Sequence, residues 1–174
     1  MNRRQFDSFW DYMRQAHGIA LRCIATIPPH QIDARPVPGM RTPKELIVHL
    51  YGGVVSGITT GVLQGCLSDE EEYEAKSRAG IKTLDDLLGF VRDRWGVADE
   101  AARSITDAHL QNVVSTPWGV GFPGGTMFQI LRDEFMHHRG QLYVYLRAMN
   151  VEPPMMWDFE HNDPEFRPRA ATGT

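Results

Sequence analysis

The sequence has few cysteines, no long apolar run and no excess of positive charge, and each absence excludes a class of protein. Cys23 and Cys66 are too few for a disulfide scaffold and do not form a CxxC pair, so we expect two reduced thiols. The net charge of −4, without a run of Lys and Arg, argues against a groove for nucleic acid. No stretch approaches the ~20 apolar residues of a membrane span. The N-terminus leads into an amphipathic helix rather than a signal core. We therefore expect a cytoplasmic protein that binds neither nucleic acid nor membrane.

The composition that remains is that of one globular helical domain. Hydrophobic residues make up 42% and charged residues 23% of the 174 residues. Apolar residues recur at helical spacing, with no competing strand pattern, in four segments: 6–27, 42–63, 83–105 and 126–149. We predict an all-α fold, in which residues 1–150 form a four-helix bundle with a long connection between helices 1 and 2. Residues 151–174 are expected to form an extended tail that packs on the bundle or on a partner.

Local signals mark the ends of two of these helices. Thr42-Pro43-Lys44-Glu45 is a capping box with proline at the first helical position, and Thr126-Met127-Phe128-Gln129 is another capping box. Asn150 suits a left-handed C-cap after the fourth helix. The second helix contains Gly52, Gly53 and Gly57, which indicates that another group approaches it closely. The acidic stretch 69–72 predicts a solvated loop or the start of a helix.

The fourth helix carries a polar pair on its apolar face. His138 stands where a leucine is expected, and Glu134 lies one turn before it, so both side chains point toward the bundle interior. A buried carboxylate is costly unless it is paired or bound to a metal ion. A divalent ion would neutralise Glu134 and accept the imidazole of His138. The alternative is a hydrogen-bonded pair without metal, and His17 on the first helix is itself interpreted as a core histidine.

The second helix offers a third candidate ligand. His49 sits at the edge of its apolar stripe, and Gly53 one turn later leaves room for another group. Glu45, one turn before His49, could orient the imidazole or act as a fourth ligand. Taken alone, His49 is by default a histidine at the boundary of the core.

Two stretches resemble the DinB-like (DNA-damage-inducible) metal-binding family. The fourth-helix string EFMHHRGQLYVYLR from Glu134 is similar to that family's last helix, and PGMRTPKELIVHL, which ends at Leu50, is similar to its second helix. The likeness spans about residues 5–155 and implies a four-helix bundle with nickel, zinc or a similar divalent ion. Carried over by position, the ligands are His49, Glu134 and His138, with a glutamate where the family typically has a histidine. A carboxylate is compatible with Zn²⁺, Ni²⁺, Mn²⁺ or Fe²⁺ and shifts preference toward harder metals.

The resemblance also assigns roles to the neighbours of these ligands. His137 is the reserve ligand if Glu134 turns away. Gly140 would allow close helix packing, and Arg139 would form an ion pair at the end of the bundle. The loop that contains Trp118 and Phe122 is either a packed connection, which we favour, or the wall of a pocket.

The function remains open among three alternatives. The first is a metal-dependent transferase or isomerase that uses a low-molecular-weight thiol as cofactor and a small molecule as substrate, as in relatives of this family. The second is a non-catalytic, dimeric metal-binding or ligand-binding module, and the third is a metal-dependent hydrolase. A closed fourth position, for example from Glu45, would favour the binding module, whereas an open position would favour catalysis. We predict a homodimer, with Met155, Met156 and Trp157 as candidate interface residues.

Overall fold

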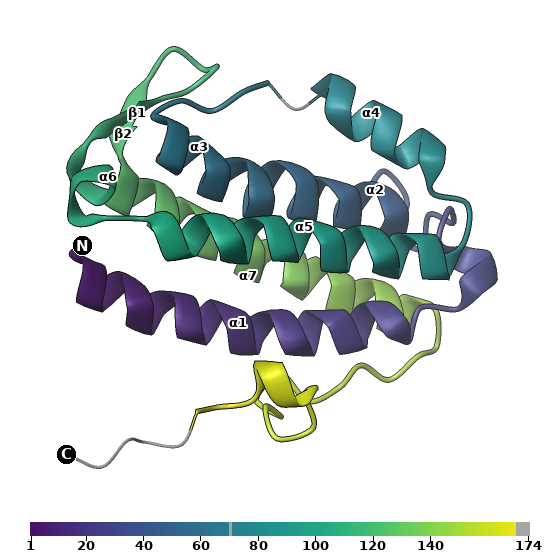
Figure 1. The fold of residues 1–174 in the computed structure, drawn as a ribbon. Coiled ribbons are helices and arrows are strands. Elements are labelled where there is room, and N and C mark those ends of the chain that lie inside the picture. The colour runs from purple at the N-terminus through teal and green to yellow at the C-terminus, as the bar shows by residue number, and fades with distance from the viewer. Residues whose placement is uncertain (70, 170–174) are drawn as a thin grey trace.

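Four long helical rods lie side by side, and each forms where the sequence predicted a helix (Figure 1). The computed structural model describes residues 1–69 and 71–169. The second rod is continuous but has three parts, of which the middle one is π-helical. The rods are α1 (Arg3–Ala25), the rod of α2 (Pro43–Val48), η2 (His49–Gly57) and α3 (Ile58–Gln64), α5 (Leu84–Ser104) and α7 (Gly124–Ala148). The prediction of an all-α fold is therefore confirmed.

Capping residues explain where most of the rods begin. Capping boxes start α1 at Asn2, α2 at Thr42 and α5 at Thr83, because each side chain accepts a hydrogen bond from a backbone N–H three residues later. The capping box predicted at Thr126 is wrong. The fourth rod, α7, already begins at Gly124, so Thr126 lies inside the helix. The left-handed Asn150 is confirmed by its φ of 59°.

Besides the long connection between helices 1 and 2 that the sequence predicted, a second long connection joins the rods. The segment between α1 and α2 contains only the short η1 (Pro29–Gln31). The segment between α3 and α5 returns along the bundle and contains α4 (Glu71–Gly80), which crosses above α2 and α3 (Figure 1). Tyr73 of α4 approaches Gly52 so closely that a Cβ there would lie 3.1 Å from its ring. This contact explains one of the three glycines in the second rod.

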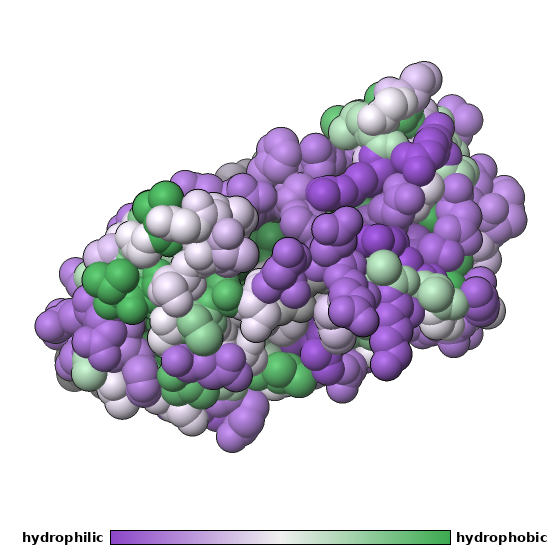
Figure 2. All heavy atoms as spheres, turned by 90° about the horizontal axis from the view of Figure 1, so that it is seen from above, coloured by the Kyte–Doolittle hydropathy of each residue, from purple (hydrophilic) through white to green (hydrophobic). Residues whose placement is uncertain are grey.

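A small hairpin separates α5 from α7. After α6 (Asp107–Gln111), strands β1 (Val113–Ser115) and β2 (Gly121–Pro123) pair antiparallel. No strand pattern is visible in the sequence here, because three-residue strands are too short to show alternation. Seen from the side of α4, hydrophobic side chains gather at the hairpin end of the molecule, whereas the opposite end is mostly hydrophilic (Figure 2).

The second rod lies at the centre of the core. Within Pro43–Gln64 an 18-residue window has a mean hydropathy of 1.6, enough by length and composition to span a membrane, contrary to the expectation that no stretch approaches a span. The protein buries 72% of that window instead, as the core helix of a soluble protein does. Both cysteines are free, Cys23 buried and Cys66 exposed. His17 is fully buried and shares a 2.8 Å hydrogen bond with Tyr51, as expected of a core histidine.

The segment after α7 lies along α1. Asp158 forms a 2.8 Å ion pair with Arg22, and the buried Asn162 donates a hydrogen bond to the carbonyl oxygen of Gln15. A Cβ at Gly18 would meet the Asn162 side chain at 2.5 Å, so only glycine permits this contact. The segment also contains η3 (Pro164–Phe166). Three of its large apolar side chains remain exposed: Met155, Met156 and Trp157.

Candidate metal centre

Three side chains from two rods converge at one point, as the sequence predicted. His49 is the first residue of η2, and Glu134 and His138 lie one turn apart on α7. One ligand atom from each of the three lies within 4.8 Å of the other two. The two imidazole rings are nearly perpendicular, with their centroids 5.0 Å apart. The arrangement is compatible with one shared metal ion.

Hydrogen bonds to the other ring nitrogens set the direction of both imidazoles. Nδ1 of His49 lies 2.8 Å from a carboxylate oxygen of Glu74, and Nδ1 of His138 lies 2.8 Å from the amide oxygen of Gln141. Both oxygens only accept, so each Nδ1 must donate. Each neutral ring is then left with a lone pair on Nε2. Histidine ligands typically have their other nitrogen tied in this way.

The buried ring nitrogen of His138 lies next to a carboxylate rather than to a proton donor. Nε2 of His138 is buried and has no hydrogen-bond partner among the described residues, and it lies 3.3 Å from a carboxylate oxygen of Glu134. Burial lowers the pKa of His138, so the ring favours its neutral form despite that carboxylate. Two acceptors at this distance repel each other unless a cation lies between them. The donor set of two nitrogens and one oxygen suits a divalent transition metal.

The π-helical segment begins at one of the three converging residues. A π-turn is rare, and π-bulges inside α-helices occur frequently at functional sites. Here the π-helical residues run from His49 to Gly57, and Gly53 lines the cavity beside the centre. The expectation that Gly53 leaves room next to His49 agrees with this position.

The residue that orients His49 is Glu74, not Glu45 as the sequence suggested. Glu45 closes the capping box with Thr42 and forms an ion pair with Arg35. Burial by itself raises the pKa of Glu74, but the hydrogen bond from His49 and nearby positive charges outweigh it and lower that pKa. Glu74 is therefore an ionised acceptor held 25 residues away from its imidazole in sequence. Local spacing offered no signal for it.

We expect the change Glu74→Ala to weaken metal binding about 10- to 100-fold, because outer hydrogen bonds fix a ligand's tautomer and direction. The measurement is a competition titration with a chromogenic chelator. Glu71→Ala is the matched control, since Glu71 lies on the same helix and lines the same cavity without contacting His49. Equal affinities for the two variants would show that Glu74 does not support the ligand.

The structure also decides the roles of the other sequence candidates. His137 is exposed and lies outside the converging group. The ion pair predicted for Arg139 is wrong, since its buried side chain has no acidic partner in the described part of the chain. The packing role predicted for Gly140 is also wrong, because a Cβ there would meet open space. Trp118 lines the cavity, contrary to the packed loop that we favoured, whereas Phe122 packs against the core.

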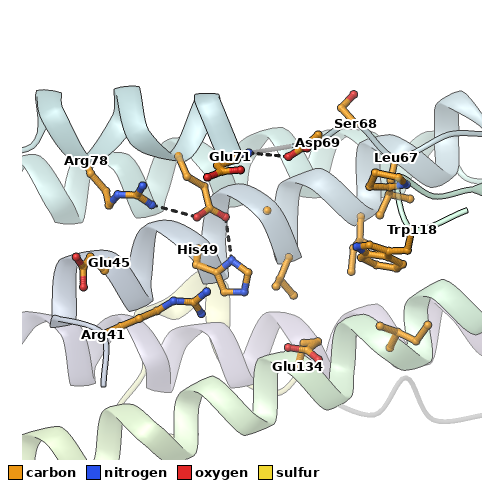
Figure 3. A pocket seen from close by; sticks show the side chains of 16 residues that line it. Arg41, Glu45, His49, Leu67, Ser68, Asp69, Glu71, Arg78, Trp118 and Glu134 are labelled. Atoms are coloured by element: carbon orange, nitrogen blue, oxygen red, sulfur yellow. Dashed lines mark hydrogen bonds and ion pairs between the residues drawn. The ribbon is translucent and has the colours of Figure 1, made fainter. Parts of the chain in front are cut away.

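The three side chains lie beside an open cavity of about 690 Å³, a size typical of small-molecule sites. Figure 3 shows its charged end, where Arg41 reaches toward His49 and Arg78 pairs with Glu74. The opposite end is apolar and includes Leu67 and the largely exposed ring of Trp118. The cavity thus offers two arginines among several carboxylates at one end, with Arg78 paired to Glu74, and an apolar wall at the other.

The fold and this centre define an all-α protein with a candidate metal site of two histidines and one glutamate. The DinB superfamily matches residues 12–142, and the chain belongs to that superfamily.

Solved structures show the same fold. A DinB-like protein from Bacillus subtilis, YjoA, has a TM-score of 0.65 at 16% identity, covering 82% of this chain and 92% of that one. A DinB-family protein from Exiguobacterium sibiricum 255-15 has a TM-score of 0.61 at 19% identity, covering 90% and 96%. No protein of curated function matches the sequence significantly.

Proposed function

We propose that this protein binds one divalent metal ion through His49, Glu134 and His138 and uses it in chemistry on a small molecule. The observation that carries the proposal is the pair of inward-facing imidazoles, each with its Nδ1 tied and its Nε2 left to bind. Three protein ligands leave at least one coordination position for another molecule. That position would face the cavity.

The donor set narrows the choice of metal. Imidazole suits Zn²⁺, Ni²⁺ and Fe²⁺, and the carboxylate of Glu134 adds Mn²⁺ to the candidates. Proteins of the superfamily that this chain resembles typically supply a third histidine at that position. We therefore propose that this chain accepts harder ions more readily than a three-histidine site does.

The reaction that we favour is thiol transfer or isomerisation. When bound, the metal ion would lower the pKa of a low-molecular-weight thiol and so supply the reactive thiolate. The sulfur would then form a bond to an electrophilic carbon of the acceptor, whose leaving group departs with its electron pair. Arg41 is exposed at the cavity and forms no ion pair within residues 1–69 and 71–169, so it is free to orient an anionic group. Trp118 would cover the apolar part of the acceptor.

Glu45 contacts other groups and is not available as a fourth metal ligand, which favours catalysis over a binding module. A purely structural metal is usually closed by four protein ligands. Glu45, the fourth ligand that the sequence offered, is engaged by Thr42 and Arg35. The cavity beside the centre would also admit a substrate.

The test is a turnover screen of the protein loaded with Zn²⁺, Ni²⁺, Mn²⁺ or Fe²⁺. Glutathione, cysteine and other small thiols are combined with electrophiles such as a halodinitrobenzene, in neutral and acidic forms. We expect metal-dependent turnover, and we expect Arg41→Met to raise KM about tenfold for acidic acceptors only, since a charge-assisted hydrogen bond contributes about 1.5–3 kcal/mol. Arg132→Met, on the outer face of α7, is the control.

Each other outcome selects an alternative. Turnover no faster than that of the metal-free protein would favour the non-catalytic binding module. Metal-dependent product formation without any thiol would favour the hydrolase. The homodimer and the cytoplasmic location stay predictions, and size-exclusion chromatography with light scattering tests the first of them.

A further inference from the structure

A second cavity lies on the other side of α7 and shares no lining residue with the first. Its volume is about 550 Å³, and it lies between α7 and the segment 152–156. At about 100° per residue, Arg139 and Tyr143 point roughly 140–180° away from Glu134 around the helix. The cavity is therefore independent of the candidate metal centre.

The inner wall of this cavity contains a buried guanidinium without an acidic partner. Arg139 is only 5% exposed, and its Nη1 has no hydrogen-bond partner. No carboxylate of the described residues lies within ion-pair distance of it. A buried charge without a partner is costly, so such a group usually belongs to a network or to a ligand.

The polar neighbours of Arg139 do not supply the missing negative charge. Burial raises the pKa of the Cys23 thiol to about 11, and burial also raises the pKa of Tyr143, so both groups are neutral at physiological pH. The buried hydroxyl of Tyr143 has no hydrogen-bond partner in the described residues other than the nearby Cys23 thiol. Glu152 lines the cavity but is exposed and forms no ion pair among the described residues. The wall thus combines the buried guanidinium of Arg139 with the hydroxyl of Tyr143, and the exposed Arg147 adds a second positive charge at the rim.

Apart from Arg139, Tyr143, Arg147 and Glu152, the cavity is lined by apolar residues and Gly140. Met136 and Val144 line it from α7, and Pro153 to Met156 line it from the other side. Val144 is 53% exposed and Met155 63% exposed, so these side chains present apolar surface at its rim. Methionine side chains adapt readily to ligands of different shape.

We infer that this cavity binds a small carboxylate with an apolar body. The carboxylate would accept hydrogen bonds from the guanidinium of Arg139 and the hydroxyl of Tyr143, since arginine binds planar carboxylates through two N–H groups. The apolar body would lie against the methionines and prolines of the rim. The volume suits a ligand of about ten to fifteen heavy atoms.

The experiment is a calorimetric titration of the full chain with sodium decanoate and, separately, with inorganic phosphate. We expect decanoate to bind at one site per chain, and phosphate to bind at least about tenfold more weakly because it leaves the apolar rim uncovered. Arg139→Met should weaken decanoate binding at least about tenfold, and Tyr143→Phe should weaken it several-fold. Arg132→Met, on the same helix but outside the cavity, should bind like the wild type.

Thermal unfolding without ligand gives a second readout. Arg139→Met should raise Tm by at least about 2 °C, because it replaces an unpaired buried charge by an apolar chain of similar length. A fall in Tm would show that Arg139 already has a partner within the chain and would overturn the inference. Equal affinities for phosphate and decanoate would do the same. A wild-type dimer that becomes a monomer in Arg139→Met would also overturn the inference. An acidic side chain of a second copy would then be the group that occupies the cavity.

Discussion

Replacing His138 by alanine is expected to reduce bound metal from about one ion per chain to a few per cent of that value after dialysis. The side chain is 6% exposed and supplies the one ligand atom that is buried and without a hydrogen-bond partner. Without it, only His49 and Glu134 remain, and two ligands on separate helices do not retain an ion against a chelator. Elemental analysis of the purified protein measures the loss.

The neighbouring variants make this experiment specific. His49→Ala should lose the metal as completely as His138→Ala, and Glu134→Ala should lose most of it. His137→Ala is the matched control, because His137 is the next residue on α7 but lies outside the converging group. Full metal in Glu134→Ala together with loss in His137→Ala would show that the ligand set is wrong.

The same variants predict a difference in thermal stability. Metal at a free concentration of about 100 times its Kd stabilises the folded state by about 2.7 kcal/mol, which for a chain of this length raises Tm by about 5–11 °C. Adding a chelator to the wild type should reverse that rise. His138→Ala should show no rise at all. An equal rise in His138→Ala would place the stabilising ion elsewhere on the protein.

Acid is expected to destabilise this protein through His17. The imidazole is fully buried and lies in a stack with Trp95, with ring centroids 4.1 Å apart and an angle of 4°. Its Nε2 has no hydrogen-bond partner in the described structure. Burial and the charge of Arg92 lower its pKa from 6.5 to about 3. A second proton on this ring would be both buried and unpaired.

The direction of the effect follows from the pKa of His17 in the unfolded chain and its lower pKa in the folded chain. Between pH 6.5 and about 3 the unfolded chain binds a proton at His17 that the folded chain does not, so stability falls as the pH falls through this window. One pKa unit corresponds to about 1.4 kcal/mol, so lowering the pH from about 7 to about 4 should cost about 3 kcal/mol from this residue alone.

His17→Phe separates this contribution from that of the acidic residues. Phenylalanine keeps an aromatic ring beside Trp95 but cannot titrate. The variant is expected to be less stable than the wild type near neutral pH, because Tyr51 loses its partner, and to lose about 3 kcal/mol less on acidification. Urea unfolding at several pH values measures the difference. The exposed His30→Gln should follow the wild type, and parallel pH profiles for wild type and His17→Phe would contradict the assignment.

Most helices and the pair of Glu134 and His138 could be predicted from the sequence because both depend on local spacing. Apolar residues at every third or fourth position define a helix face, and the i, i+4 relation of Glu134 and His138 turns both to one side. His49 joined them through the likeness to the DinB-like family. Residues that are close in sequence are oriented by the helix itself, so their direction needs no knowledge of the rest of the fold.

Contacts between distant segments could be found only in the tertiary structure. The segment around α4 gave only an acidic loop or helix start, yet packing places Glu74 against His49 and frees Glu45 for its capping box. The sequence also expected an ion pair for Arg139, and only the packing of α7 showed that no acid reaches it. The amino-acid sequence thus determined the helices and the ligands that one helix orients, because hydrophobic periodicity is a property of neighbouring residues. The tertiary structure decided which groups hydrogen-bond to those ligands and which buried charges have no ion-pair partner. Both depend on burial and on contacts between distant segments, which only the assembled fold creates.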